Sequence, residues 1–132
     1  MKTILIISML LAFGLTSSVH PQPTTDEDFC KSYAKSDAQM NRLYKQILVE
    51  YRKDTLFITK FRTAQRAWLA FRDAHYSSRF PDPNPGAYGS VISTCRCQEL
   101  DEMTISRVDQ LERWVRHAEE GDVCSGSIKL KQ

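Results

Sequence analysis

Three stretches of the chain carry apolar side chains at steps of three and four residues, the spacing that places them on one face of an α-helix. No stretch alternates at a period of two, so the pattern predicts helices and no sheet. The first helix is expected over about 27–52, the second from Asp54 or Thr55, and the third up to about Gly121. The apolar faces consist, in chain order, of Met40, Leu43, Tyr44, Ile47, Leu48 and Tyr51; Phe57, Phe61, Ala64, Trp68, Phe71 and His75; and Leu100, Met103, Arg107, Leu111, Trp114 and Ala118.

A proline-rich segment separates the second and third helices. It reads RFPDPNPGAYGS over 79–90. Prolines at alternate positions stiffen it as extended chain, whereas Gly86 and Gly89 allow turns. The sequence therefore predicts an all-α fold, a three-helix antiparallel bundle with a long Pro/Gly loop between helices two and three.

The N-terminal residues have the pattern of a secretory signal peptide. One lysine precedes an apolar run over 4–15, and small residues follow it. The run is too short to span a bilayer comfortably, and no cysteine stands at its end for lipid attachment. We therefore expect a signal peptide over 1–18 with cleavage at about residues 18–22, one helical domain over 26–124 and a short tail over 125–132. The protein is expected to be exported, periplasmic or secreted, and soluble without membrane association once the signal is removed.

Four cysteines in an exported chain indicate disulfide bonds. A bond between Cys95 and Cys97 would close a strained small ring, so each is expected to pair elsewhere. In an up-down-up arrangement helix three starts after Cys97, at the end where helix one begins beside Cys30, which predicts that Cys30 pairs with Cys95 or Cys97. Cys124 would then pair with the remaining cysteine, although a straight third helix holds it about 30 Å away. Alternatively, the long loop crosses the bundle and Cys124 meets Cys30.

Charge divides the chain into two parts. Over 31–72 there are ten Lys or Arg against three acids, and over 99–122 there are eight acids against three Arg. Either the two parts attract each other within the fold, or one of them meets a charged partner.

The residue types argue against catalysis and cofactor binding. His75 lies on the second apolar face, and His117 has only Glu120 at helical spacing. The pair at Cys95 and Cys97 lacks the spacing of redox motifs, and no metalloprotease, serine-hydrolase or phosphate-loop motif is present. The tyrosines within the basic part fall on or near the first apolar face, which disfavours nucleic-acid binding. We expect no enzyme activity, no metal and no cofactor.

The stretch AQRAWLAFRDAHY, over 64–76, combines polar side chains with a tryptophan. Gln65, Trp68 and Arg72 are neighbours on a helix. Arg72 can stack on Trp68 and hold backbone carbonyls of a loop, while Asp73 points about 100° away, toward Arg66 or another helix. The pattern favours a structural clamp, and direct contact with a partner is the alternative.

Several segments together resemble the exported bacterial LprI-type lysozyme-inhibitor domains. They are SDAQMNRLYKQIL over 36–48, the stretch over 64–76, a Gly-Ser after a variable loop, a cysteine, and MTISRVDQL over 103–111. Relatives usually have a cysteine where this chain has Tyr76, so the local disulfide differs. The motif residues that the resemblance assigns are Asp37, Asn41, Tyr44, Gln65, Trp68, Arg72, Asp73, Gly89, Ser90, Thr104 and Arg107.

The resemblance implies inhibition of lysozyme or a related muramidase, enzymes that work with two carboxylates in a cleft. Donors on the stiff loop, at Arg79, Asn84, Tyr88 and Ser90, could engage those carboxylates. The acidic third helix could attract a cationic lysozyme surface. The alternative is a non-catalytic structural or adaptor module of the cell envelope with no enzyme target.

Overall fold

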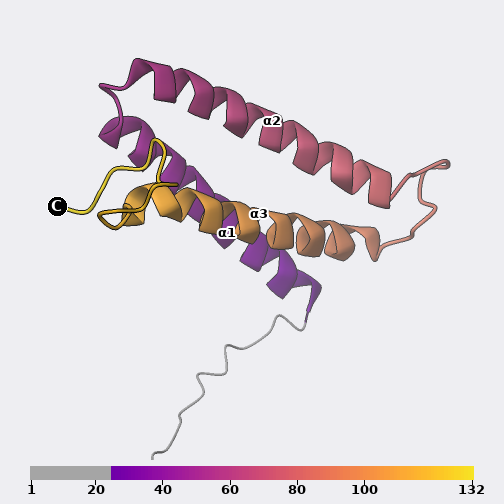
Figure 1. The fold of residues 1–132 in the computed structure, drawn as a ribbon. Coiled ribbons are helices and arrows are strands. Elements are labelled where there is room, and N and C mark those ends of the chain that lie inside the picture. Colours follow the sequence, from indigo (N-terminus) through magenta and orange to yellow (C-terminus); the bar gives the residue numbers. More distant parts are fainter. Residues whose placement is uncertain (1–24) are drawn as a thin grey trace, which may run out of the picture.

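The fold is that of a computed structural model, which describes residues 25–132. It consists of the helices α1 (Asp26–Glu50), α2 (Thr55–Arg79) and α3 (Ile92–Arg116), and the described residues form no strand (Figure 1). The prediction of an all-α chain with three helices is confirmed. The predicted signal peptide over 1–18 and its cleavage site lie outside the described residues.

Short polar side chains begin the first two helices. The Thr25 hydroxyl accepts a hydrogen bond from the backbone N–H of Asp28 at 3.2 Å, and Asp54 Oδ1 accepts one from the N–H of Phe57 at 2.9 Å. Helix α3 has no side-chain cap and begins at Ile92, before the predicted start after Cys97. It ends before the predicted Gly121, because His117 takes a φ of 61° and turns the chain back.

Helices α1 and α3 start at the same end of the molecule and pack against each other along most of their lengths, whereas α2 meets α3 at few places (Figure 1). A disulfide joins Cys30 to Cys97 with 4.8 Å between their Cα atoms. This pairing confirms the prediction that Cys30 bonds to one cysteine of the Cys95–Cys97 pair.

The predicted second disulfide is absent from the structure. Cys95 and Cys124 are both free thiols. Cys95 lies in the first turn of α3, and Cys124 follows the far end of the same 25-residue helix, so a straight helix of about 37 Å separates their surroundings. That length is far beyond the reach of a disulfide.

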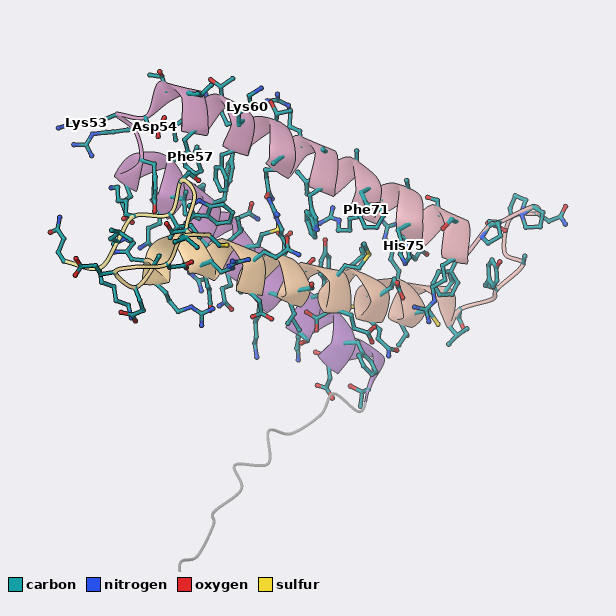
Figure 2. The ribbon with its side chains drawn as sticks, viewed as in Figure 1. Lys53, Asp54, Phe57, Lys60, Phe71 and His75 are labelled. Atoms are coloured by element: carbon teal, nitrogen blue, oxygen red, sulfur yellow. A yellow bond between two sulfur atoms is a disulfide. The ribbon has the colours of Figure 1, made fainter. Side chains whose placement is uncertain are left out.

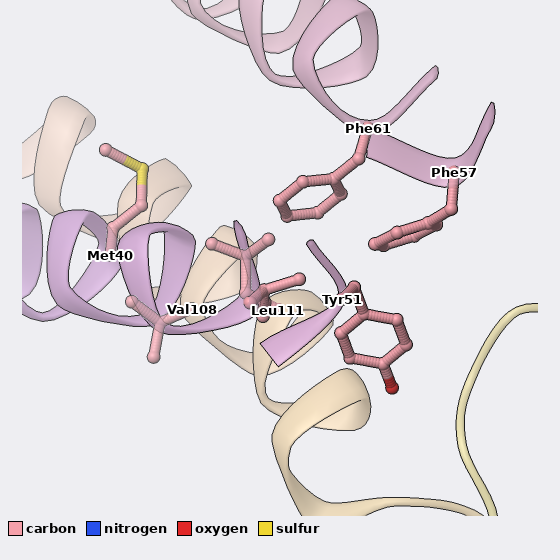
Figure 3. Close-up of a cluster of buried hydrophobic side chains, with 7 residues drawn as sticks. Met40, Tyr51, Phe57, Phe61, Val108 and Leu111 are labelled. Atoms are coloured by element: carbon pink, nitrogen blue, oxygen red, sulfur yellow. The ribbon is translucent and has the colours of Figure 1, made fainter. Parts of the chain in front are cut away.

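The hydrophobic core lies toward the end where α1 joins α2 (Figure 3). The aromatic rings of this core contact one another, with Phe57 5.2 Å from Phe61 and 4.8 Å from Tyr51 between ring centroids. Burying each large apolar side chain of this kind contributes about 1.5–3 kcal/mol to folding. The buried members are Met40, Ile47, Tyr51, Phe57, Phe61, Val108 and Leu111.

The second half of α2 departs from its predicted apolar face. Phe71 is 57% exposed, and His75 is exposed as well, although both were placed on that face by their spacing. The reason is that α2 contributes Phe57 and Phe61 to the buried core, with Ile58, Trp68 and Leu69 packed against it, and beyond these residues it faces α3 mainly through polar side chains.

The C-terminal segment folds back onto the ends of α1 and α3. Ala118 and Leu130 form an isolated parallel bridge, with the Ala118 N–H donating to the Lys129 carbonyl at 2.8 Å. The Tyr51 hydroxyl donates to the Trp114 carbonyl at 3.1 Å and accepts from the Lys129 N–H at 3.0 Å. Residues beyond 124 are thereby attached to the helices.

Candidate partner-binding site

The loop between α2 and α3 projects beyond the ends of both helices (Figure 1). Aromatic side chains brace its base. The Tyr88 hydroxyl donates to the Pro81 carbonyl at 2.7 Å, and the Tyr88 ring meets Phe80 edge-on at 5.9 Å between centroids. Two successive turns follow, closed by hydrogen bonds of 3.0 Å to the carbonyls of Asn84 and Gly86. The loop is thus held by its own contacts while residues 81–91 stay exposed.

A buried carboxylate holds the end of α2 against α3. Glu99 on α3 is almost fully buried and pairs with the guanidinium of Arg79, in the last turn of α2, and with His75 Nε2 at 3.2 Å. Figure 2 shows His75 on the side of α2 that faces α3. Removing one partner from a buried ion pair is costly, so this cluster fixes where the loop leaves α2.

The four predicted loop residues differ in how free their donors are. Tyr88 commits its hydroxyl proton to Pro81, and Arg79 commits part of its guanidinium to Glu99. Asn84 is exposed, and among the described residues its side-chain amide has no hydrogen-bond partner. Ser90 is exposed too, and its carbonyl accepts from the Ser93 hydroxyl at 3.1 Å. The side-chain donors with no partner among the described residues are thus the Asn84 amide and the Ser90 hydroxyl, and Arg79 keeps part of its guanidinium free.

Arg96 is a further exposed cation at this end of the molecule, and the sequence pattern did not indicate it as a candidate. Its guanidinium lies over the Tyr76 ring, 5.3 Å from the centroid. The early start of α3 puts Arg96 on the helix beside the loop. Extending the predicted third helix upstream through Cys95 and Cys97 would have placed Arg96 beside the loop.

Arg72 is a cross-link between helices rather than a clamp on the loop. Its guanidinium lies over Trp68 at 5.5 Å from the centroid, as predicted, but its polar partners are Asp73 at 3.0 Å and Asp37 of α1 at 3.8 Å. Asp73 therefore pairs with Arg72 and not with Arg66. Asn41 fixes the Asp37 carboxylate through a hydrogen bond of 2.9 Å.

Arg107 makes the matching cross-link from α3. Its Nε donates to Gln65 Oε1 at 3.0 Å, and its Nη1 donates to Gln110 Oε1 at 2.8 Å. Its guanidinium also lies 5.8 Å from the centroid of Trp68, so this ring contacts two guanidinium groups from two helices. Burial lowers the pKa of Arg107. Gln65 in turn donates to the sulfur of Met40 on α1 at 3.5 Å.

The remaining motif residues lie in packing or turn positions. Tyr44 stacks on Phe61 with 5.4 Å between centroids, and Thr104 is completely buried on α3. Gly89 has a φ of 64°, a conformation that favours glycine, in the last turn before α3. The motif thus holds α1, α2 and α3 in register, and only its Gly-Ser part belongs to the loop.

An open hollow of about 380 Å³ lies between α2 and α3, next to the Glu99 cluster. Trp68, Phe71 and Met103 give it an apolar wall, and Glu102, Ser106 and Gln110 give it polar groups. It is a concave surface that a partner could contact in addition to the projecting loop.

No group of three or more His, Cys, Asp or Glu side chains in residues 25–132 is placed to hold a metal ion. His75 and His117 are instead engaged by Glu99 and by Glu50 respectively, the latter at 2.5 Å.

None of the helices in the described part of the chain is long and apolar enough to cross a membrane.

Fold and site together define a small, disulfide-linked helical protein whose concave and protruding surfaces suit binding. The profile of the family described as Lysozyme inhibitor LprI matches residues 17–111, most of the chain, and the chain belongs to that family. Comparisons with curated proteins and with solved structures gave no significant match.

Proposed function

We propose that the protein is a non-enzymatic inhibitor of lysozyme or a related muramidase, and that it blocks the enzyme with the loop between α2 and α3. The main support is the projecting loop, which is braced by the hydrogen bond from Tyr88 to Pro81. This loop presents side-chain donors of Asn84 and Ser90 that have no partner in the described part of the chain. Membership of the LprI family supports the choice of target.

The chemistry of the target explains why such donors are suitable. Muramidases cleave glycosidic bonds with a pair of carboxyl groups that flank the scissile bond. Amide and hydroxyl donors held in a fixed geometry can hydrogen-bond to those carboxylates, and hydrogen bonds to charged groups are stronger than neutral ones. Because the loop is braced before binding, little conformational entropy is lost when it enters the cleft.

The protein acts outside the cytoplasm, after removal of its signal peptide, where a muramidase meets the cell wall. Exposed acids of α3, among them Glu102 and Asp109, attract a cationic enzyme and raise the association rate. Added salt therefore slows association, because exposed charges are screened.

The test measures inhibition of lysozyme-driven clearing of a peptidoglycan suspension. Replacing Asn84 and Ser90 together by Ala should raise the inhibitory concentration at least about 100-fold, since each lost charge-assisted hydrogen bond costs about 1.5–3 kcal/mol and every 1.4 kcal/mol is a factor of ten. Gln46→Ala, an exposed amide on α1, is the control and should change nothing.

Two results would contradict the proposal. The first is a parent protein that does not slow clearing at any concentration. The second is full inhibition by the Asn84 and Ser90 double variant combined with loss of inhibition in Phe71→Ala, which would move the site to the hollow between α2 and α3.

A further inference from the structure

The connection between α1 and α2 carries an unneutralised positive charge. Residues 45–62 hold five cations and two acids. Both acids are engaged, because Glu50 pairs with His117 and Lys129 and Asp54 caps α2. None of the five cations forms an ion pair with any residue in the described part of the chain. They are Lys45, Arg52, Lys53, Lys60 and Arg62, all exposed, and with Val49 and Leu56 they form what is here named the basic corner.

Two aliphatic side chains stand among these cations. Val49 is 63% exposed and Leu56 is 70% exposed, among the largest values for apolar residues in the described chain. Lys45 lies one turn before Val49 on α1, and Arg52 Nη1 donates to the Val49 carbonyl at 3.2 Å. Lys60 lies one turn after Leu56 on α2. Each exposed aliphatic group thus has cationic neighbours.

The basic corner lies at the end of the molecule opposite the loop between α2 and α3. Figure 2 shows Lys53 extending from the connection of α1 and α2, and Lys60 pointing away from the other two helices. A surface that contacts the basic corner therefore leaves the loop and its Asn84 and Ser90 donors free.

We propose that the basic corner docks the protein on a membrane surface rich in anionic lipids. Lysine and arginine side chains are attracted to anionic head groups, and aliphatic side chains between them enter the interface. This inference is independent of the proposed inhibition. It differs from the expectation, drawn from sequence, that the mature protein has no membrane association, and the vesicle experiment below decides between the two.

A nucleic acid fits this surface less well. Binding of single strands uses aromatic side chains on which bases stack. The tyrosines nearest the basic corner are occupied, because Tyr44 stacks on Phe61 and Tyr51 packs against Phe57. Exposed Val49 and Leu56 would gain nothing from contact with phosphate groups.

The test is co-sedimentation with vesicles of phosphatidylcholine, alone or with one third phosphatidylglycerol. The disulfide, the core and the C-terminal segment all lie within 25–132, so a chain starting at residue 22 keeps the fold and omits the apolar run over 4–15. It should bind only the anionic vesicles. Arg52→Gln with Lys53→Gln should lower the partition coefficient about 30-fold, and Leu56→Ser roughly tenfold.

Matched controls carry the same changes elsewhere. Lys35→Gln with Arg113→Gln alters net charge equally, and Ile105→Ser removes an exposed aliphatic side chain of α3. Controls that bind like the parent support the proposal. Equal loss in controls and corner variants overturns it, as does no binding to either vesicle. Binding to single-stranded or duplex nucleic acid that is at least as tight and is insensitive to Leu56→Ser also overturns it, as does self-association that depends on the basic corner without lipid binding.

Discussion

Trp68 is the residue at which the polar cross-links of the molecule meet. Arg72 and Arg107 both lie over its ring, and they continue to Asp37 on α1 and to Gln65 on α2. Helix geometry alone predicted that residues at steps of three and four in AQRAWLAFRDAHY would be neighbours. It could not predict the partner of Arg72, because Asp37 is brought there by the packing of another helix.

Arg72→Ala should lower the free energy of unfolding by about 2 kcal/mol. The change removes the stacking on Trp68 and leaves Asp37 without its cation, and losses of this kind cost about 1–3 kcal/mol. Urea denaturation followed by circular dichroism measures it. The control is Arg66→Ala, an exposed arginine that donates only to Thr63, and it should stay within about 0.5 kcal/mol of the parent. An Arg72→Ala variant with unchanged stability and abolished partner binding would show that the residue contacts the partner.

Stability should fall in alkaline solution because of two tyrosines. Burial raises the pKa of Tyr51 and of Tyr33 above the ordinary 10.0. The unfolded chain therefore releases these protons at lower pH than the folded chain does. Their contribution is complete below about pH 10 and is lost as the pH rises through the folded pKa values. Urea midpoints from about pH 8 to 11 measure the loss. Tyr51→Phe should reduce the loss, whereas a loss equal to that of the parent would contradict this assignment.

Among the elements, α1 follows its predicted pattern most closely, and α2 follows it least. Every predicted apolar residue of α1 from Met40 to Tyr51 belongs to the core or packs against it. Phe71 and His75 keep the right period on α2 but stay exposed, and Phe71 lines only the open hollow beside α3. Periodicity states which side chains share a face, whereas burial of that face depends on how far the neighbouring helices extend alongside it.

The disulfide between Cys30 and Cys97 joins the starting turns of α1 and α3 across 67 residues. Replacing both by Ser should lower the free energy of unfolding by about 4 kcal/mol, the loop-closure entropy for a ring of this size. Replacing Cys95 and Cys124 should cost far less, because neither is bonded. Peptide mapping of the unreduced protein, with titration of two free thiols, checks the pairing. A peptide linking Cys124 to another cysteine would contradict it.

At the scale of the whole molecule, the segment after α3 is part of the folded domain. Lys129 places its N–H on the Tyr51 hydroxyl and its ammonium on the Glu50 carbonyl, 2.9 Å away. No periodic pattern marks the residues after Gly121, so the sequence indicated only a short tail there. The contacts that hold this segment come from its backbone, from a lysine and from turns at glycines, none of which a hydrophobic pattern records.

Deleting residues 126–132 should therefore lower the free energy of unfolding by about 1–3 kcal/mol, because Tyr51 and Trp114 lose hydrogen-bond partners. Thermal denaturation of the shortened chain measures the change. Lys131→Gln in the full-length chain is the control. It affects only an exposed pair with Glu119 and should be nearly neutral. A shortened chain as stable as the parent would indicate that the folded domain ends at about residue 124, as the sequence predicted.

Because α2 is packed unevenly along its length, a small rotation of this helix displaces the loop at its end. The helix is fixed by aromatic rings at its first turns, whereas its last turns contact α3 through the Glu99 carboxylate and through Arg96, whose guanidinium lies over Tyr76. A helix of 25 residues is about 37 Å long. A rotation of about 5° at the aromatic end would therefore carry the loop about 3 Å, as much as the length of a hydrogen bond. The direction in which the loop projects thus depends on the Glu99 carboxylate, although Glu99 need not contact the target.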